Sequence, residues 1–173
     1  MKKKNLKHIL SIMVDNEPGV LARVVGLFSG RGYNIESLSV SEVDSHKFLS
    51  RITVVTSGTK IIVDQIKAQL AKLIPVHNLV DITELKSFIG KELILIKLDV
   101  KNKKTVDLKK KLERLGAKIL EDDDVELIVQ FTGSPNEVRK IESILKPHKI
   151  IEQTRSGLVS MATGTDYITK IER

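Results

Sequence analysis

Residues 15–38 read DNEPGVLARVVGLFSGRGYNIESL, and this stretch decides how the start of the chain folds. Its apolar residues recur at steps of three and four, which predicts one amphipathic helix over residues 20–31. The apolar stripe consists of Val20, Leu21, Val24, Val25, Leu27 and Phe28. Pro18 suits the first helical position, where no N–H is needed, and Gly30 and Gly32 suit the end of the helix. We therefore expect a strand on each side of a single helix.

The start of this predicted helix has the features of a site for a small carboxylate. The backbone N–H groups of Gly19, Val20 and Leu21 are expected to be free, and such groups bind anions at a helix N-terminus. Gly19 also lets a ligand approach the backbone closely. The amides of Asn16 and Asn34 can donate and accept hydrogen bonds together, which the ammonium and carboxylate of an amino acid require.

A plainer interpretation of the same residues stays open. In it, Asn16 or Glu17 only caps the helix, and Asn34 only tolerates an unusual turn conformation. A single Pro-Gly pair before a helix does not decide between a ligand site and a local turn.

The whole chain divides into two similar units on its pattern of apolar residues. The first unit has predicted strands at 8–14, 35–41, 48–57 and 76–83 and helices at 20–31 and 62–73. The second has strands at 92–100, 118–121, 125–133 and from 150, with helices marked by Leu108, Leu112, Leu115 and by Val138, Ile141, Leu145. Each order is β-α-β-β-α-β, so we expect an α+β fold of two tandem ferredoxin-like domains. The expected domains are 1–85 and 86–173, with a linker at Lys86–Lys91, and domains this small gain stability from association.

Composition excludes several classes of protein. The chain has 173 residues, 41% of them hydrophobic, with no cysteine and only 3% aromatic residues. The cores are therefore expected to be aliphatic and without disulfides. No run approaches the roughly 20 apolar residues of a membrane span, and no signal-peptide pattern follows the basic start. We expect a cytoplasmic protein without a membrane partner.

The positive charge does not indicate a nucleic-acid partner. The formal net charge is +7, but the excess is spread over both halves of the chain. The densest basic run, Lys101–Lys111, is interrupted by Leu108, as in a solvated helix face. The strand at 48–54 has one aromatic residue and lacks the aromatic pattern with which ferredoxin-like RNA-binding domains stack bases.

The chain lacks the residue combinations that catalysis and metal binding need. Its four histidines are scattered, and no cysteine or group of carboxylates stands beside them; they are His8, His46, His77 and His148. Asp122–Asp124 suits a turn between strands and lacks the spacing of a calcium loop. There is no nucleophile elbow, P-loop or dinucleotide fingerprint. We therefore expect neither an enzyme nor a metal site.

Several motifs closely resemble those of the acetolactate synthase (acetohydroxyacid synthase) small regulatory subunit. That family begins with an ACT domain, a small amino-acid-sensing module. The resemblance lies in Asn16–Leu21, Arg31–Leu38, Leu49–Arg51, Lys91–Lys97 and Arg155–Gly157. These motifs span nearly the whole chain in the right order, and the first two are the most specific.

The resemblance implies a function that composition does not reveal. Such a subunit is not catalytic; it raises the activity of a large catalytic subunit and confers feedback inhibition, usually by valine. The large subunit condenses pyruvate with a second 2-oxo acid in valine, leucine and isoleucine synthesis. It holds thiamine diphosphate, magnesium and FAD, and no cofactor is expected in this chain. An ACT-type sensor that regulates another metabolic enzyme is the alternative.

The resemblance also implies which residues bind the amino acid. The expected valine site consists of Asn16, Gly19, Val20, Leu21, Asn34 and Ile35. Asn16 and Asn34 would hold the polar end of the ligand at a seam between two ACT domains of a homodimer. Ala22 stands where relatives often have serine, and the tail after Gly157 lacks the family's arginine-glycine pair. Which branched-chain amino acid is preferred stays open, because one methylene is worth only about 1–3 kcal/mol.

Overall fold

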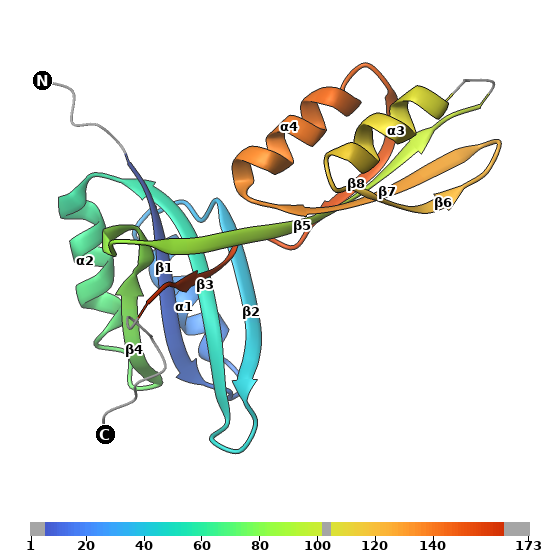
Figure 1. The fold of residues 1–173 in the computed structure, drawn as a ribbon. Helices are drawn as coiled ribbons and strands as arrows, with labels where there is room; N and C mark the ends of the chain where they lie inside the picture. Colours follow the sequence, from blue (N-terminus) through green and yellow to red (C-terminus); the bar gives the residue numbers. More distant parts are fainter. Residues whose placement is uncertain (1–5, 102–104, 165–173) are drawn as a thin grey trace, which may run out of the picture. The chain divides into compact units, whose positions relative to one another are not determined.

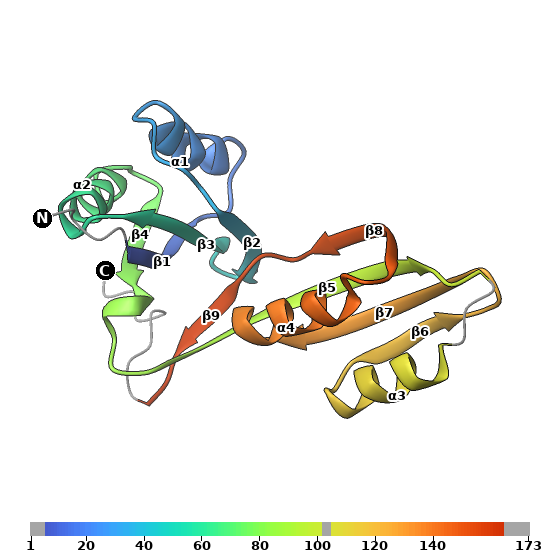
Figure 2. The same ribbon diagram turned by 90° about the horizontal axis from the view of Figure 1, so that it is seen from above.

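The computed structural model describes residues 6–101 and 105–164, which form two compact units (Figures 1 and 2). Contacts group residues 6–89 and 158–164 into the first unit and residues 90–157 into the second. Each unit has the β-α-β-β-α-β order and one antiparallel sheet. The prediction of two tandem ferredoxin-like domains is confirmed.

The first unit has four main strands and two helices. They are β1 (Leu6–Asp15), α1 (Val20–Ser29), β2 (Ser37–Asp44), β3 (Leu49–Gly58), α2 (Lys60–Leu70) and β4 (Val76–Asp81). The sheet order is β2-β3-β1-β4, and every neighbouring pair is antiparallel. A short 3₁₀ helix, η1 (Ile82–Glu84), follows β4.

The central strand β1 is buried on both faces, which explains why its sequence is apolar nearly throughout. Leu10, Ile12 and Val14 face the two helices and pack with Val24 and Phe28 of α1. The alternate face of the sheet carries a smaller cluster, made of Ile9, Val55, Ile82 and Leu158. The cores are largely aliphatic because the chain has so few aromatic residues.

The C-terminal segment belongs to the first unit. Leu158 is 4% exposed, and its N–H donates to Ser37 Oγ at 3.0 Å. It is followed by a short strand, β9 (Val159–Ala162), which pairs with β5 and which the sequence did not predict. The grouping of contacts thus differs from a simple division into 1–85 and 86–173, and that division stays a prediction.

The second unit repeats the same topology. Its elements are β5 (Phe88–Asp99, begun in the first unit), α3 (Val106–Arg114), β6 (Lys118–Asp122), β7 (Glu126–Gly133), α4 (Pro135–Leu145) and β8 (Lys149–Arg155). Its strand order is β6-β7-β5-β8. The expected linker at Lys86–Lys91 is wrong in part, because Phe88–Lys91 already lie in β5.

Two turns of the second unit show what its polar residues do. Asp123 Oδ1 accepts hydrogen bonds from the N–H groups of Val125 and Glu126, both at 2.7 Å. Backbone hydrogen bonds from Glu126 and Val125 lower the pKa of Asp123. Ser134 and Glu137 form a capping box at the start of α4. The acidic turn is therefore explained by local backbone hydrogen bonds.

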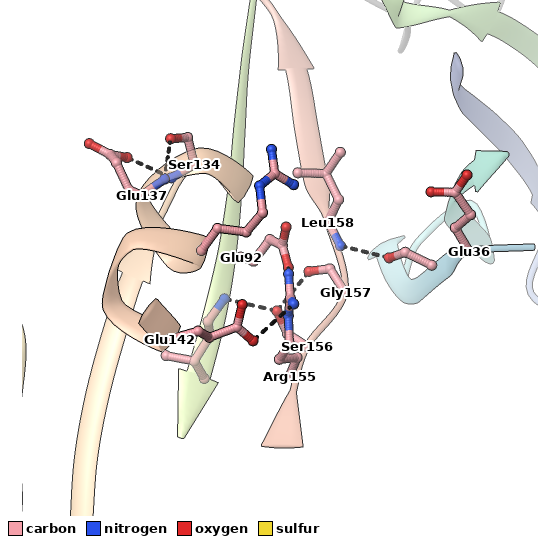
Figure 3. A network of polar contacts seen from close by, with 12 residues as sticks. Glu36, Glu92, Ser134, Glu137, Glu142, Arg155, Ser156, Gly157 and Leu158 are labelled. Carbon is pink, nitrogen blue, oxygen red and sulfur yellow. Dashed lines mark hydrogen bonds and ion pairs between the residues drawn. The ribbon is translucent and has the colours of Figure 1, made fainter. Parts of the chain in front are cut away.

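Two short motifs of the second unit meet in space (Figure 3). Arg155 Nε donates to the buried Glu92 carboxylate at 3.0 Å, and its Nη1 reaches Glu142 at 3.3 Å. The Ser156 N–H donates to Leu93 O, and the Leu93 N–H donates to Ser156 Oγ, both at 3.0 Å. The end of β8 is thus fixed to β5 by side chains as well as by the sheet.

Candidate functional site

The Pro-Gly pair before α1 forms a tight turn. The Val20 N–H donates to Glu17 O at 3.3 Å, with Pro18 and Gly19 between them. Gly19 has φ 84° and ψ −9°, the left-handed conformation that the third position of a type II turn requires. The helix begins at Val20, so the expectation that Pro18 is the first helical residue was wrong.

The N-terminus of α1 is open. The N–H groups of Gly19, Leu21 and Ala22 have no acceptor in the described part of the chain, and no side chain caps the helix. The first N–H to be satisfied inside the helix belongs to Arg23, which donates to Gly19 O at 3.0 Å. The Val20 N–H, expected to be free, is used in the turn instead. Open N–H groups and the helix dipole favour a carboxylate here.

Asn16 lies beside this helix end and does not cap it. Its N–H donates to Phe48 O at 2.6 Å, and its side-chain Oδ1 accepts from Ser50 Oγ at 3.0 Å. With Oδ1 engaged, the amide NH₂ group remains to donate to a ligand. The sequence did not show that Ser50 and Phe48 hold Asn16: both were recognised as part of a strand, and Ser50 also as part of the motif Leu49–Arg51, but neither was connected with the site. Phe48 is 68% exposed and has φ 51°, unusual for a residue with a side chain.

Asn34 lies at the other end of the same sheet. Its carbonyl accepts a hydrogen bond from Thr56 Oγ1 at 2.7 Å, whereas Asn16 contacts Ser50 of the same strand. These two β3 residues are six positions apart, so the asparagines are separated by about 20 Å along the strand. Asn34 has no positive φ, which removes the alternative that it serves an unusual turn. One chain therefore does not bring both asparagines to the same small ligand.

The other predicted site residues divide between core and surface. Val20 is 4% exposed and packs in the first unit's core, whereas Leu21 is 41% exposed beside the open N–H groups. Ile35 is half-buried next to Asn34 and packs against the same core. Near the open helix end, Leu21 therefore supplies the exposed apolar surface.

Two carboxylates near the asparagines are paired, whereas the exposed Glu17 next to Asn16 has no ion pair in the described part of the chain. Asp15 Oδ1 lies 2.5 Å from His77 Nε2, at the end where Asn16 stands. Close to Asn34, Glu36 lies 2.8 Å from Lys7 Nζ. Hydrogen bonds from Lys7 and then Ser57 lower the pKa of Glu36. Pairing reduces the repulsion that these acidic groups would exert on a bound carboxylate.

The described part of the chain was also searched for a metal site and for a membrane-spanning helix. Across residues 6–101 and 105–164, no three His, Cys, Asp or Glu side chains gather as ligands for a metal ion. The Nδ1 atom of His8 lies 2.7 Å from Oδ2 of the buried Asp81. His46 and His148 are far from both residues in the sequence. None of the helices in those ranges has both the length and the apolar character for crossing a membrane.

Comparison with family models matches both halves of the chain. Residues 10–78 match the model described as the AHAS small subunit-like ACT domain. Residues 91–164 match the model for the small subunit of acetolactate synthase. The two matches follow one another in the order of the two ferredoxin-like folds.

Curated proteins and a crystal structure that resemble this chain are also acetolactate synthase small subunits. The acetolactate synthase small subunit of Buchnera aphidicola subsp. Schizaphis graminum is 37% identical, over 92% of this chain and 100% of that protein. The isozyme 3 small subunit of Salmonella typhimurium is 34% identical, over 92% and 97%. The acetolactate synthase small subunit of Thermotoga maritima superposes with a TM-score of 0.84 at 29% identity, covering 93% of this chain and 99% of that one.

Proposed function

Because the chain belongs to the acetolactate synthase small subunit family and begins with an ACT domain, we propose that it regulates a catalytic large subunit without being catalytic itself. In this proposal it stimulates acetolactate formation and confers feedback inhibition by valine. Its partner holds thiamine diphosphate, magnesium and FAD, and this chain binds none of them. The setting is the cytoplasmic synthesis of valine, leucine and isoleucine.

The observation that carries the proposal is the open N-terminus of α1. The N–H groups of Gly19, Leu21 and Ala22 are available for a carboxylate, and the Asn16 amide is held beside them by Ser50. Leu21 offers exposed apolar surface next to these donors. Together they match an amino acid that carries an apolar side chain.

The distance between Asn16 and Asn34 supports a homodimer. A single valine spans far less than the separation of about 20 Å between the two asparagines along β3. A ligand that contacts both must therefore lie between two copies, with Asn16 from one protomer and Asn34 with Ile35 from its partner. We accordingly propose two equivalent sites for each dimer.

The direct test is reconstitution with a matched large subunit. The isolated chain should form no acetolactate from pyruvate, should raise the rate of the large subunit, and should make that rate sensitive to valine. Calorimetric titration with valine, leucine and isoleucine then ranks the ligands. Turnover by this chain alone would refute the proposal, and ligand binding without any stimulation would favour a sensor for another metabolic enzyme.

A further inference from the structure

Strand β8 is an unprotected edge of the second unit's sheet. It is last in the order β6-β7-β5-β8, and its only strand partner in the described part of the unit is β5. All seven of its residues are exposed. The outer side of such a strand presents N–H and C=O groups that can pair with another extended chain.

A groove runs beside this edge, between β8 and the helix α4. Its volume is about 590 Å³, and it is lined by Arg139, Glu142, Ser143, Lys146, His148 and Ile150. The helical residues are spaced at three, four and seven positions, which places them on one face of α4. Ile150 supplies an apolar floor and is 38% exposed.

The groove carries uncompensated positive charge. In the described part of the chain, Arg139 bonds only to the neutral Asn136 side chain, and Lys146 forms no ion pair. The one acidic group, Glu142, already accepts hydrogen bonds from Arg155 and Gln153. A ligand here meets basic groups without a matching carboxylate.

We propose that β8 and α4 bind an extended acidic segment of a partner protein, which adds one strand to the sheet. Its backbone pairs with the outer edge of β8, its acidic side chains meet Arg139 and Lys146, and an apolar side chain covers Ile150. The length of the edge favours a peptide over a small anion. This surface belongs to the second unit and is separate from the proposed valine site.

A second copy of the chain fits this edge less well. Antiparallel self-pairing centred on β8 would set Glu152 opposite Glu152 and Lys149 opposite Arg155. Like charges directly opposite one another destabilise a sheet. The charges of β8 therefore oppose that pairing, whereas those of the groove suit an acidic strand.

The test uses the full chain and the peptide Glu-Thr-Val-Thr-Glu-Thr-Glu-amide, which carries fluorescein at its N-terminus; its acidic side chains and its valine share one face of the strand. Binding is measured by fluorescence anisotropy. We expect saturable binding that the double variant R139E/K146E weakens at least about tenfold, because charge-assisted hydrogen bonds are lost. The matched control is K110E/K111E, which makes the same change of charge at exposed positions of α3. It should change the affinity less than about twofold, as for surface charges away from the groove.

Three further probes test whether binding depends on acidic side chains and on backbone pairing with β8. A peptide with lysine in place of glutamate should not bind, and one N-methylated along its backbone should lose binding because it cannot pair with β8. Equal binding to both charge variants, or retained binding of the N-methylated peptide, would overturn the proposal. So would a fluorescein-labelled single-stranded RNA that binds this face when the acidic peptide does not.

Discussion

The guanidinium of Arg155 binds the carboxylate of Glu92, although 63 residues separate them in the sequence. The Glu92 side chain is 8% exposed and that of Arg155 is 35% exposed. The pair connects the end of β8 to β5 (Figure 3). Two motifs that resemble the small-subunit family, Lys91–Lys97 and Arg155–Gly157, are therefore one structural feature rather than two.

Replacing Arg155 by methionine should lower the free energy of unfolding by about 1–3 kcal/mol, because it leaves a buried carboxylate without its main partner. The partial exposure of Arg155 keeps the expected loss below that of a fully buried pair. Urea unfolding measures it. The double variant E92L/R155M should recover part of the loss, and an Arg155→Met chain as stable as the wild type would show that Glu92 is solvated.

The capping box of α4 predicts an acid-dependent loss of stability. Hydrogen bonds from the backbone and then the side chain of Ser134, with a smaller effect of Lys91, lower the pKa of Glu137 from 4.5 to about 2. A lowered pKa stabilises the fold above pH 4.5, and this contribution disappears as the pH falls from 4.5 toward 2.

The variant Glu137→Gln tests this, because glutamine can keep the cap but does not titrate. Its unfolding free energy should fall less steeply than that of the wild type over this acid range. The unfolding free energy of each protein is measured by urea unfolding at several pH values. If it fell equally steeply with pH in the variant and in the wild type, the expectation would be contradicted. Ser134→Ala, which removes the cap itself, should cost about 1 kcal/mol at neutral pH.

Gly19→Asp should abolish feedback inhibition by valine while leaving stimulation of the large subunit largely intact. A Cβ at Gly19 meets nothing within 4 Å, so the new side chain would fit without a clash and place its charge at the open helix end. Gly19→Asn is the matched control. Both side chains share the strain of the positive φ at this position, which Asn and Asp bear better than most residues, and only aspartate repels a carboxylate.

Valine titrations of the reconstituted complexes measure the difference between the two Gly19 variants. We expect asparagine to retain more inhibition than aspartate. If both variants were inhibited like the wild type, the ligand would bind elsewhere and Gly19 would serve only the type II turn.

Asn34→Ala should weaken valine inhibition by roughly ten- to over a hundredfold, because a hydrogen bond to a charged group is worth about 1.5–3 kcal/mol. The Asn34 side chain is exposed and makes no hydrogen bond in the described part of the chain, so stability should hardly change. The same valine titration, with a thermal unfolding curve as its control, decides the matter. Unaltered inhibition would place Asn34 outside the ligand site.

The periodic parts of the fold could be predicted from the sequence, and the contacts between distant segments could not. Alternation in Glu126–Gly133 and the stripe of α1 follow directly from burial on one face. The strand β9 has no such pattern, since its place depends on contacts far away in the sequence. Pro18 was expected to suit the first helical position because the same Pro-Gly pair suits both a helix start and a type II turn.

The candidate site was predictable only in part for the same reason. The glycine at position 19 and the open helix end follow from local sequence, as does the position of Asn16. The hydrogen bond from Ser50 to Asn16 joins β3 to the residue that follows β1, and the separation of Asn34 from Asn16 follows from the register of β3. Neither is visible before the sheet is assembled.

The burial of Leu158 has a consequence for synthesis on the ribosome. The cluster of Ile9, Val55 and Ile82 lacks one of its members until residue 158 has been translated. Domains generally fold as units in order of synthesis. Here the first unit can form its helix-covered core early, but its other sheet face stays partly uncovered while the second unit is made. A chaperone that binds apolar surface therefore has its longest opportunity at this face, before residue 158 leaves the exit tunnel.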